Sequence, residues 1–276
     1  MKTALITGAT RGIGRALAFS LAKRGYEIHF IGRNDKSGEA VLNELRKINP
    51  EGEHELFLLD LSLIKANKEF LNEYTKNYMK LDLLVLNANP LPKNLKITEE
   101  GHDEIFGVGY LSRYMFSVAL NGLLSKSKIS RVMHMGDARI LSKIQFDQIK
   151  NPTYSALKAL LMSYSASAQI TYFLNKNGLT DVPHEFMYPG LVATNQTKEK
   201  SAFAKKLSKA FGMSEPVDAG EIIAKHIDDV DSKDCKMKYY DRLKETKIQS
   251  KIAKRESEFE QLLDVSVKMT GFAFKK

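Results

Sequence analysis

The sequence of 276 residues is poor in cysteine and has no long hydrophobic run. Its single cysteine, Cys235, cannot form a disulfide within the chain, which favours a reducing compartment, and we expect a cytoplasmic protein. No apolar run reaches the ~18 residues that span a bilayer, so the sequence predicts no membrane span. The first expected strand begins at Thr3, which leaves no room for a signal peptide before it.

The sequence also lacks internal repeats and linkers, a nucleic-acid-binding pattern and the spacing of metal ligands, and each absence excludes a class of architecture or function. The chain has no internal repeat, low-complexity segment or linker, so we expect one domain over residues 1–276. Its net charge is +9, but the lysines are dispersed and lack the interleaved aromatic residues typical of nucleic-acid binding. The positive surface is instead expected to attract a polyanionic cofactor. No set of His, Cys, Asp and Glu has the spacing of a metal site, so we expect neither nucleic acid nor metal.

Short apolar runs alternate with longer helical patterns along most of the chain. The expected strands are Thr3–Thr7, Glu27–Gly32, His54–Asp60, Leu81–Ala88, Arg131–Gly136, Val182–Tyr188 and Lys236–Tyr240. The expected helices cover about 12–25, 37–48, 63–78, 99–122, 152–176, 215–229 and, near the C-terminus, 253–270. Several strands are nearly continuous apolar runs, which is typical of parallel strands buried on both faces. The pattern predicts an α/β fold, a single doubly wound (Rossmann) domain with a seven-stranded parallel sheet flanked by helices.

A glycine-rich turn joins the first expected strand to the first helix, with the sequence Thr7-Gly8-Ala9-Thr10-Arg11-Gly12-Ile13-Gly14. Gly8 permits a tight turn, Gly12 lets the backbone approach a pyrophosphate, and Gly14 lets the helix pack close to the sheet. The helix N-terminus offers unpaired N–H groups and a partial positive charge to phosphates. Because a strand precedes the turn and a helix follows it, we expect dinucleotide binding by Gly8, Thr10, Arg11, Gly12, Ile13 and Gly14.

The second expected strand ends in Gly32-Arg33-Asn34, without the acidic residue that an NAD-preferring site usually presents to the ribose diol. Arg33 can meet a 2′-phosphate with charge-assisted hydrogen bonds, and Arg11 could reach the same phosphate. The alternative is that both are ordinary surface arginines. Two arginines without a competing acid favour NADP(H) over NAD(H), and we count Arg33 and Asn34 among the cofactor-binding residues.

The segment Tyr154-Ser155-Ala156-Leu157-Lys158 begins the expected helix after the fifth strand, about 140 residues after the glycine turn. The i, i+4 spacing would place Tyr154 and Lys158 on one helix face. Together with the glycine turn, this pattern resembles the short-chain dehydrogenase/reductase family. Phe146-Asp147, Phe211–Pro216 and the segment Leu263–Gly271 resemble its retinol-dehydrogenase-like branch. The resemblance covers essentially the whole chain and implies hydride transfer between a nicotinamide and a carbonyl or alcohol.

The resemblance also implies roles for residues at other strand ends. Asp60-Leu61 is similar to the pair that contacts adenine, Asn87-Ala88 to the start of the family's NAG segment, and Pro189–Thr194 to the loop beside the nicotinamide. Asn87, Val192 and Thr194 would position the nicotinamide. A loop from about Ala193 to Gly212 would close over a small or lipophilic substrate. Family members often pair through helices like those at 99–122 and 152–176, which implies a possible homodimer or homotetramer.

The Tyr154 and Lys158 pair would supply the proton that carbonyl reduction needs. A free tyrosine has a pKa near 10, too high for a useful donor at neutral pH. A lysine ammonium ~5 Å away would favour the phenolate by ~3 kcal/mol, or roughly two pKa units. In the family this lysine also holds the nicotinamide ribose. The alternative for Tyr154 is an ordinary, half-buried helix tyrosine.

Three positions depart from the family pattern. Gly136-Asp137 stands where a serine pair is expected, Gly109 stands where the preceding helix often has asparagine, and Asn89-Pro90 follows Asn87. Asp137 could be a protonated donor that replaces serine, could point away so that Ser142 fills the gap, or could weaken the site. The sequence favours an NADP-dependent enzyme with Tyr154, Lys158 and Asp137 as catalytic candidates. The alternative is a non-catalytic NADP(H)-binding sensor or scaffold with a degenerate site.

Overall fold

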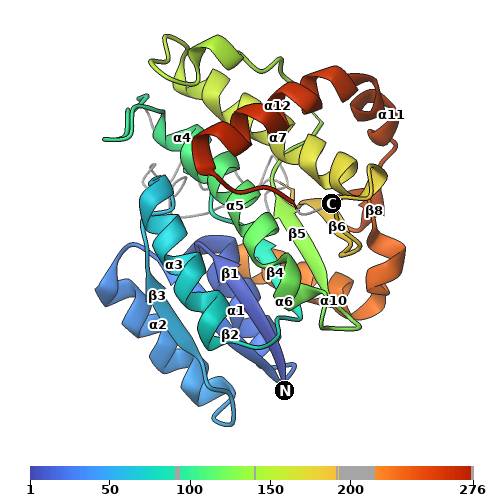
Figure 1. Cartoon of the computed structure of the whole chain (residues 1–276). Coiled ribbons are helices and arrows are strands. Elements are labelled where there is room, and N and C mark those ends of the chain that lie inside the picture. Colours follow the sequence, from blue (N-terminus) through green and yellow to red (C-terminus); the bar gives the residue numbers. More distant parts are fainter. Residues whose placement is uncertain (91–93, 140, 191, 193–214, 275–276) are drawn as a thin grey trace, which may run out of the picture.

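The computed structural model describes residues 1–90, 94–139, 141–190, 192 and 215–274, and its centre is one eight-stranded sheet (Figure 1). The strand order is β3-β2-β1-β4-β5-β6-β7-β8. Seven strands are parallel: β1 (Lys2–Thr7), β2 (Tyr26–Gly32), β3 (Glu55–Leu58), β4 (Leu83–Leu86), β5 (Arg131–Met135), β6 (His184–Tyr188) and β7 (Lys238–Asp241). The doubly wound fold is confirmed. The eighth strand, β8 (Lys244–Glu245), is antiparallel to β7 and was not predicted, because two residues carry no periodic signal.

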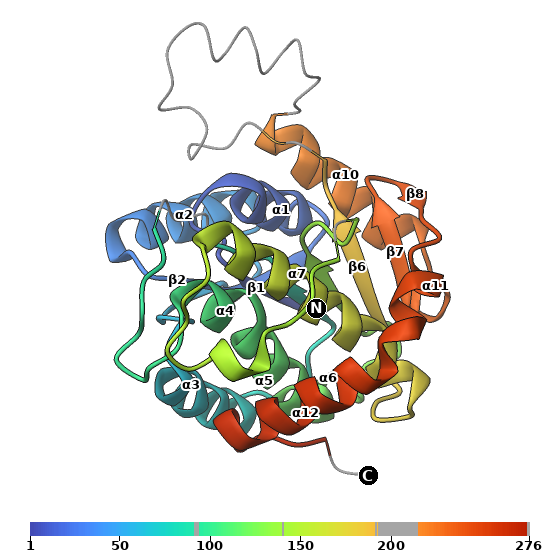
Figure 2. The ribbon, with the colours of Figure 1, turned by 90° about the horizontal axis from the view of Figure 1, so that it is seen from above.

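Helices cover both faces of the sheet. The longer ones are α1 (Gly12–Ala22), α2 (Asp35–Ile48), α3 (Ile64–Asn77), α5 (Ser112–Ala119), α7 (Ala156–Lys176), α10 (Pro216–Asp229) and α12 (Glu256–Thr270). The short ones are α4 (Glu104–Phe106), α6 (Asn121–Leu124) and α11 (Gln249–Ile252), with the 3-10 turns 146–148, 232–235 and 253–255. Figure 2 shows α1, α2 and α10 along one face, α3, α5 and α7 along the other, and α12 outside α7. No helix within the described ranges has the length and hydropathy needed to cross a bilayer.

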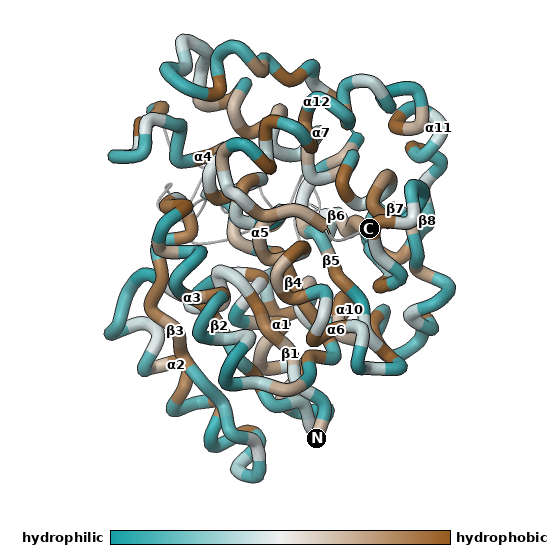
Figure 3. The backbone as a smooth tube through the Cα atoms, in the orientation of Figure 1, coloured by the Kyte–Doolittle hydropathy of each residue, from teal (hydrophilic) through white to brown (hydrophobic). Residues whose placement is uncertain are grey.

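Each central strand is buried on both faces, which explains its continuous apolar sequence. Ala4 and Ile6 of β1 belong to the apolar cluster that includes residues of α1 and α10. Leu5, between them, points to the opposite cluster, which contains residues of α3, α5 and α7. Successive side chains of a strand alternate between faces, so both faces need apolar residues. In Figure 3 the hydrophobic colour accordingly follows the central strands, whereas the outer helices are largely hydrophilic.

The helix expected at 99–122 begins later and is less regular than the sequence suggested. Asp103 caps α4 by accepting a hydrogen bond from the backbone N–H of Phe106 at 2.6 Å. The next turn, Gly107–Leu111, is π-helical, and regular α-helix resumes in α5. Single π-helical turns inside helices are frequent at functional sites. The two glycines in this turn, Gly107 and Gly109, carry no side chain to oppose its wider geometry.

The helix expected at 152–176 begins at Ala156, so Tyr154 lies before it. Ser155 is the N-cap residue, with an extended backbone and a side-chain oxygen that accepts from the Lys158 N–H at 3.3 Å. The i, i+4 argument for Tyr154 and Lys158 therefore fails, because only Lys158 is inside the helix. Near the C-terminus, the last helix ends at Gly271, which follows α12 with a φ of +70°.

Candidate active site

The glycine turn lies at the carboxyl end of β1, where the strand order reverses between β2 on one side and β4 on the other. In open α/β sheets this switch point is where ligands bind. Gly8 has a φ of +69° and Gly12 a φ of +59°, both in the left-handed region that side chains disfavour. The fold thus places the predicted dinucleotide turn where a dinucleotide would bind.

Asn87 holds the glycine turn in place. Its Nδ2 donates hydrogen bonds to the carbonyl oxygens of Thr7 at 2.9 Å and of Gly8 at 3.1 Å. A Cβ atom on Gly14 would lie 2.5 Å from Asn87 Nδ2 and 2.6 Å from the Gly8 carbonyl oxygen. The Ala88 N–H donates to Thr7 Oγ1 at 3.0 Å. The predicted site residues Asn87 and Ala88 therefore fix the turn from the neighbouring strand, and Gly14 permits that close packing.

The first turn of α1 is open toward a phosphate. Its N-cap residue, Arg11, has extended backbone and no side-chain capping hydrogen bond, and the first turn contains no acidic residue. By contrast, Asn34 caps α2 through Oδ1, which accepts from the Ser37 N–H at 2.8 Å. Because the first N–H groups of a helix need an acceptor, the uncapped α1 fits a pyrophosphate. Asn34 is also a predicted cofactor residue, and in this structure its amide oxygen is used to cap α2.

Two further predicted residues line the same turn. Thr10 approaches β2 so closely that a Cβ atom on Gly32 would lie 2.3 Å from Thr10 Cγ2. Ile13 packs partly buried against the apolar cluster under α1. The absence of a side chain at Gly32 therefore lets the turn lie over the end of β2, next to Arg33.

Arg33 is not free of acids, which corrects the prediction from the sequence. Its Nη1 contacts Glu104 Oε1 at 2.8 Å and lies 3.8 Å from Asp60 Oδ2. Glu104 is 71 residues away in the sequence, so only the fold reveals it. The Arg33 side chain is still 53% exposed, so a 2′-phosphate could compete with Glu104 for it. Arg11 is exposed on the turn.

Of the remaining predicted cofactor residues, three have a described position in the structure and Thr194 does not. Asp60 Oδ1 accepts hydrogen bonds from the Ser62 N–H at 2.9 Å and from Ser62 Oγ at 2.7 Å, which fixes this carboxylate at the end of β3. Leu61 and Val192 are buried. Thr194 lies outside the described residues, as does nearly all of the predicted substrate loop.

Tyr154 is bonded to a carboxylate rather than placed beside Lys158. Its hydroxyl donates to Asp103 Oδ2 at 2.5 Å, and Lys158 Nζ donates to Ser142 Oγ at 2.8 Å and to the Lys143 carbonyl oxygen at 3.1 Å. Burial raises the pKa of Tyr154, and the hydrogen bond and negative charge of Asp103 raise it further. The expectation that Lys158 lowers the pKa of Tyr154 is therefore wrong for this structure.

Asp137 forms an ion pair with Arg139. Its carboxylate accepts from the Arg139 N–H at 3.0 Å, from Nε at 2.9 Å and from Nη2 at 2.7 Å. Burial tends to raise the pKa of Asp137, but the hydrogen bonds and charge of Arg139 outweigh it, and the pKa lies below its usual value. The ion pair with Arg139 therefore favours the ionised form of Asp137 over the protonated donor considered from the sequence. Ser142, the alternative, meets Lys158.

A different tyrosine, Tyr164, lies against the carboxyl ends of β4 and β5. Asn89 Nδ2 donates to the Tyr164 hydroxyl oxygen at 2.5 Å. A Cβ atom on Gly136 would lie 2.8 Å from both Cδ1 and Cε1 of the Tyr164 ring. Two of the residues that depart from the family pattern therefore serve Tyr164. Gly136 leaves room for its ring, and Asn89 donates a hydrogen bond to its hydroxyl oxygen.

Gly109 allows a similarly close contact with the same helix. A Cβ atom there would lie 2.8 Å from Ser163 Cβ, and Ser167 Oγ donates to the Gly109 carbonyl oxygen at 2.9 Å. All three departures from the family pattern thus face α7 within one turn of Tyr164. Sequence reasoning missed this tyrosine, although the glycine at position 136 is a signal of a bulky neighbour.

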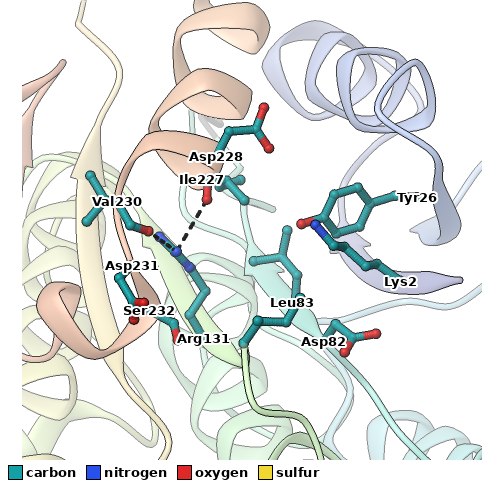
Figure 4. Close-up of a pocket in the computed structure, with 11 residues that line it drawn as sticks. Lys2, Tyr26, Asp82, Leu83, Arg131, Ile227, Asp228, Val230, Asp231 and Ser232 are labelled. Atoms are coloured by element: carbon teal, nitrogen blue, oxygen red, sulfur yellow. Dashed lines mark hydrogen bonds between the residues drawn. The ribbon is translucent and has the colours of Figure 1, made fainter.

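A pocket of about 210 Å³ lies at the opposite edge of the sheet (Figure 4). Lys2, Leu83 and Arg131, at the amino ends of β1, β4 and β5, are among the residues that line it. Figure 4 shows Arg131 donating to the carbonyl oxygens of Ile227 and Val230, so its guanidinium joins β5 to the end of α10. Ligands of open α/β sheets bind at the carboxyl ends of the strands, and this pocket lies at the other end of the strands from the predicted cofactor turn.

Comparison with known proteins identifies the family. The model of the short chain dehydrogenase family matches residues 2–205, so the chain belongs to this family. Among characterised relatives, human retinol dehydrogenase 14 is 30% identical over 70% of this chain and 62% of its own length. Mouse retinol dehydrogenase 12 is 28% identical over 71% of this chain and 63% of its own length. Human polyprenol dehydrogenase is 25% identical over 75% of this chain and 66% of its own length. The chain thus spans a little under two thirds of most of these relatives.

Solved structures show the same fold. A short chain dehydrogenase from Shigella flexneri complexed with NADP is 20% identical, covers 88% of this chain and 97% of its own, and superposes with a TM-score of 0.67. An alcohol dehydrogenase from Thermococcus sibiricus complexed with 5-hydroxy-NADP is 24% identical, covers 87% of this chain and 95% of its own, and has a TM-score of 0.66. At these identities the likeness establishes the Rossmann-type fold.

Proposed function

We propose that this protein is an oxidoreductase that binds NADP(H) in preference to NAD(H) and interconverts an alcohol and a carbonyl compound. The observation that carries the proposal is the glycine turn at the switch point of the sheet, followed by a helix whose N-terminus has no cap and no acid. Such an N-terminus stabilises phosphate through its free N–H groups and the helix dipole. Membership in the short-chain dehydrogenase family is consistent with hydride transfer.

Each predicted cofactor residue has a proposed task. The backbone of Gly8 to Gly14 would hold the pyrophosphate, Asp60 and Leu61 the adenine, and Asn87 with Val192 the nicotinamide side. Arg33 would leave Glu104 for the 2′-phosphate, because a dianionic phosphate offers a guanidinium more charge-assisted hydrogen bonds than one carboxylate does. The bound nicotinamide would supply or accept the hydride.

The relatives suggest the class of substrate. Several are called retinol dehydrogenases or polyprenol dehydrogenases, names that refer to retinol and to polyprenols. We therefore propose a lipophilic alcohol or aldehyde as the substrate of this chain. Pairing of two chains through α5 and α7 stays a prediction.

A non-catalytic NADP(H)-binding protein is the second candidate, and specific contacts favour it. The Tyr154 hydroxyl donates a hydrogen bond to Asp103, and the Asp137 carboxylate is paired with Arg139. Neither of these predicted catalytic groups is therefore available to a substrate as the structure stands. This candidate requires a sound cofactor turn and no turnover.

Two measurements test the proposal. Fluorescence titration should give tighter binding of NADPH than of NADH, and equal affinities would contradict the cofactor assignment. Absorbance of NADPH should then fall with a lipophilic aldehyde, for example retinal, and NADPH should form with the corresponding alcohol. Tight NADPH binding without turnover on any member of a retinoid, polyprenol and short-chain panel would favour the non-catalytic candidate.

A further inference from the structure

Tyr154 and Tyr164 differ in what holds their hydroxyl proton. The Tyr154 O–H donates a hydrogen bond to the carboxylate of Asp103. In the contact of Tyr164 with Asn89 the amide N–H is the donor, so the Tyr164 oxygen accepts and its own proton is not used in that bond. A general acid must present its proton to the substrate within hydrogen-bond reach. In this structure the Tyr154 proton is held by Asp103, whereas no partner among the described residues takes the Tyr164 proton.

A short chain of contacts links Tyr164 to the glycine turn. Asn87 holds the carbonyl oxygen of Gly8, and Asn89, two residues further along the same segment, holds the hydroxyl of Tyr164. Two residues span at most about 7 Å of backbone, so the phenol lies next to the carboxyl end of β4. Tyr154, which precedes the first turn of α7, is about 12 Å or more from Tyr164 along the helix axis, at ~1.5 Å per residue.

A buried cation, Arg113 of α5, supplies positive charge beside Tyr164. Its side chain is 1% exposed, and Nη2 donates to the Ala88 carbonyl oxygen at 3.1 Å. Its Nε and Nη1 have no hydrogen-bond partner within the part of the chain that the structure describes. Burial lowers the pKa of Arg113 to about 10, so the guanidinium is still charged at neutral pH. A buried, incompletely paired cation is costly and needs a compensating anion.

The groups around Tyr164 act on its pKa in opposite directions. Burial raises the pKa of Tyr164 most, the charge of Arg113 lowers it, and the charge of Asp137 raises it. The hydrogen bond from Asn89 lowers the pKa, whereas Tyr188 on β6 raises it. The Tyr164 phenolate is the anion that would satisfy Arg113, which is the electrostatic task that the sequence assigned to Lys158.

We propose that Tyr164 is the residue that transfers the proton, with Asn89 and Arg113 as positioning residues that replace the expected lysine. This inference rests on the proposed oxidoreductase function. In the reducing direction the carbonyl carbon takes a hydride, with its electron pair, from the reduced nicotinamide. The carbonyl oxygen takes the hydroxyl proton of Tyr164, and the nicotinamide is oxidised. The phenolate then regains a proton from water, and alcohol oxidation reverses each transfer.

Turnover of matched variants is the first test. Tyr164→Phe should lower kcat about 100-fold or more, the typical worth of a general acid, while the Kd for NADPH changes less than about twofold. Tyr172→Phe, on the same helix without a hydrogen bond to its hydroxyl in the described structure, is the control for loss of a phenol. A smaller loss in Tyr164→Phe, or an equal loss in Tyr154→Phe, would overturn the assignment.

A second readout does not depend on turnover. In protein labelled with ¹³C at Cζ of tyrosine, addition of NADP⁺ should shift the Tyr164 resonance and lower its pKa, because the oxidised nicotinamide is cationic. Arg113→Met should raise the pKa of Tyr164, and Lys158→Met should leave it where it is. A response of Tyr154 to NADP⁺ with none from Tyr164 would overturn the inference. If the wild type lacks turnover but these shifts occur, the proposed activity fails while the placement of Tyr164 stands.

Discussion

The glycine turn and the start of α7 are both carboxyl-end features of the sheet, but the sequence describes them unequally well. The turn works through its own backbone: Gly8 and Gly12 have positive φ, and the open N-terminus of α1 follows directly. The α7 region works through side chains whose partners are remote in sequence, such as Asn89, 75 residues from Tyr164. A local motif therefore predicts where the glycine turn lies in the fold, whereas a local motif at α7 pointed to Tyr154.

The difference teaches that a motif predicts local structure well when the contacts that define it are made within the motif itself, and poorly when its side chains bond to residues that are remote in sequence. Tyr154 and Lys158 have the expected spacing, but the helix begins between them and their partners are Asp103 and Ser142. The spacing of Tyr154 and Lys158 does not show where the helix starts. Ser155 lies between them and caps the helix, so the helix begins only after Tyr154. The variants below test the two regions separately, in order of decreasing expected effect.

Gly12→Val should abolish NADPH binding, with a loss of about 100-fold or more in affinity, because a branched side chain blocks the approach of the pyrophosphate. The φ of +59° adds backbone strain. Gly25→Val is the matched control, since Gly25 has a φ of +76° and its Cβ would meet nothing within 4 Å. Isothermal titration with NADPH and far-UV circular dichroism measure binding and folding. A folded Gly12→Val variant that binds NADPH normally would place the dinucleotide elsewhere.

Arg33→Ala should weaken NADPH binding by about 1.5–3 kcal/mol, or roughly 10- to 150-fold, because a charge-assisted hydrogen bond to the 2′-phosphate is lost. NADH, which lacks that phosphate, should bind nearly as before. Arg46→Ala, on the exposed face of α2, is the control for loss of a surface charge. Fluorescence titration of both cofactors gives the answer. An equal loss for NADPH and NADH would remove Arg33 from 2′-phosphate recognition.

Gly136→Ser should destabilise the fold by about 1–3 kcal/mol, since the new Cβ would overlap the Tyr164 ring and overpacking costs that much. The overlap follows from the 2.8 Å separation of that Cβ position from the ring. The same substitution at Gly122, where a Cβ meets nothing within 4 Å, should be tolerated. Urea unfolding measures both. A Gly136→Ser protein as stable as the wild type would show that Tyr164 does not need this glycine.

Glu104→Gln should strengthen NADPH binding by about 0.2–1 kcal/mol, because the amide holds the Arg33 guanidinium less firmly than a carboxylate. The Arg33–Glu104 contact of 2.8 Å is partly exposed, which keeps the effect small. The affinity for NADH should change less. If Glu104→Gln weakens NADPH binding instead, Glu104 orients Arg33 for the phosphate rather than competing for it.

Asp137→Asn should move the pH profile of alcohol oxidation to lower pH. The negative charge of Asp137 raises the pKa of Tyr164, so its removal lowers that pKa and the phenolate forms at lower pH. Arg113→Met should move the profile the opposite way, because the positive charge lowers the same pKa. The pH dependence of kcat with a lipophilic alcohol measures both. Shifts in the same direction would show that Tyr164 is not the titrating group.

The order of strands and helices was largely predictable from the sequence, and so was the dinucleotide turn. Apolar runs such as that of β4 are buried on both faces, and that burial is the same in any parallel sheet. The start of α7, the π-helical turn at Gly107–Leu111 and the strand β8 were not predictable. Each of these features involves few residues. The helix start depends on one capping residue, the π-helical turn on a change from i+4 to i+5 hydrogen bonds, and β8 has two residues, so none of them gives a periodic signal.

The sequence by itself determined the family, the doubly wound sheet and the glycine turn, because each depends on periodicity or on backbone freedom that is local to the chain. The tertiary structure decided which side chains face one another. It placed Glu104 on Arg33, Arg139 on Asp137, and Asn89 on Tyr164. The charge state of a carboxylate and the freedom of a hydroxyl proton depend on neighbours brought together by folding. The chemistry of this candidate site therefore depends on the folded protein. The glycine turn, by contrast, consists of eight consecutive residues and can be recognised from the sequence.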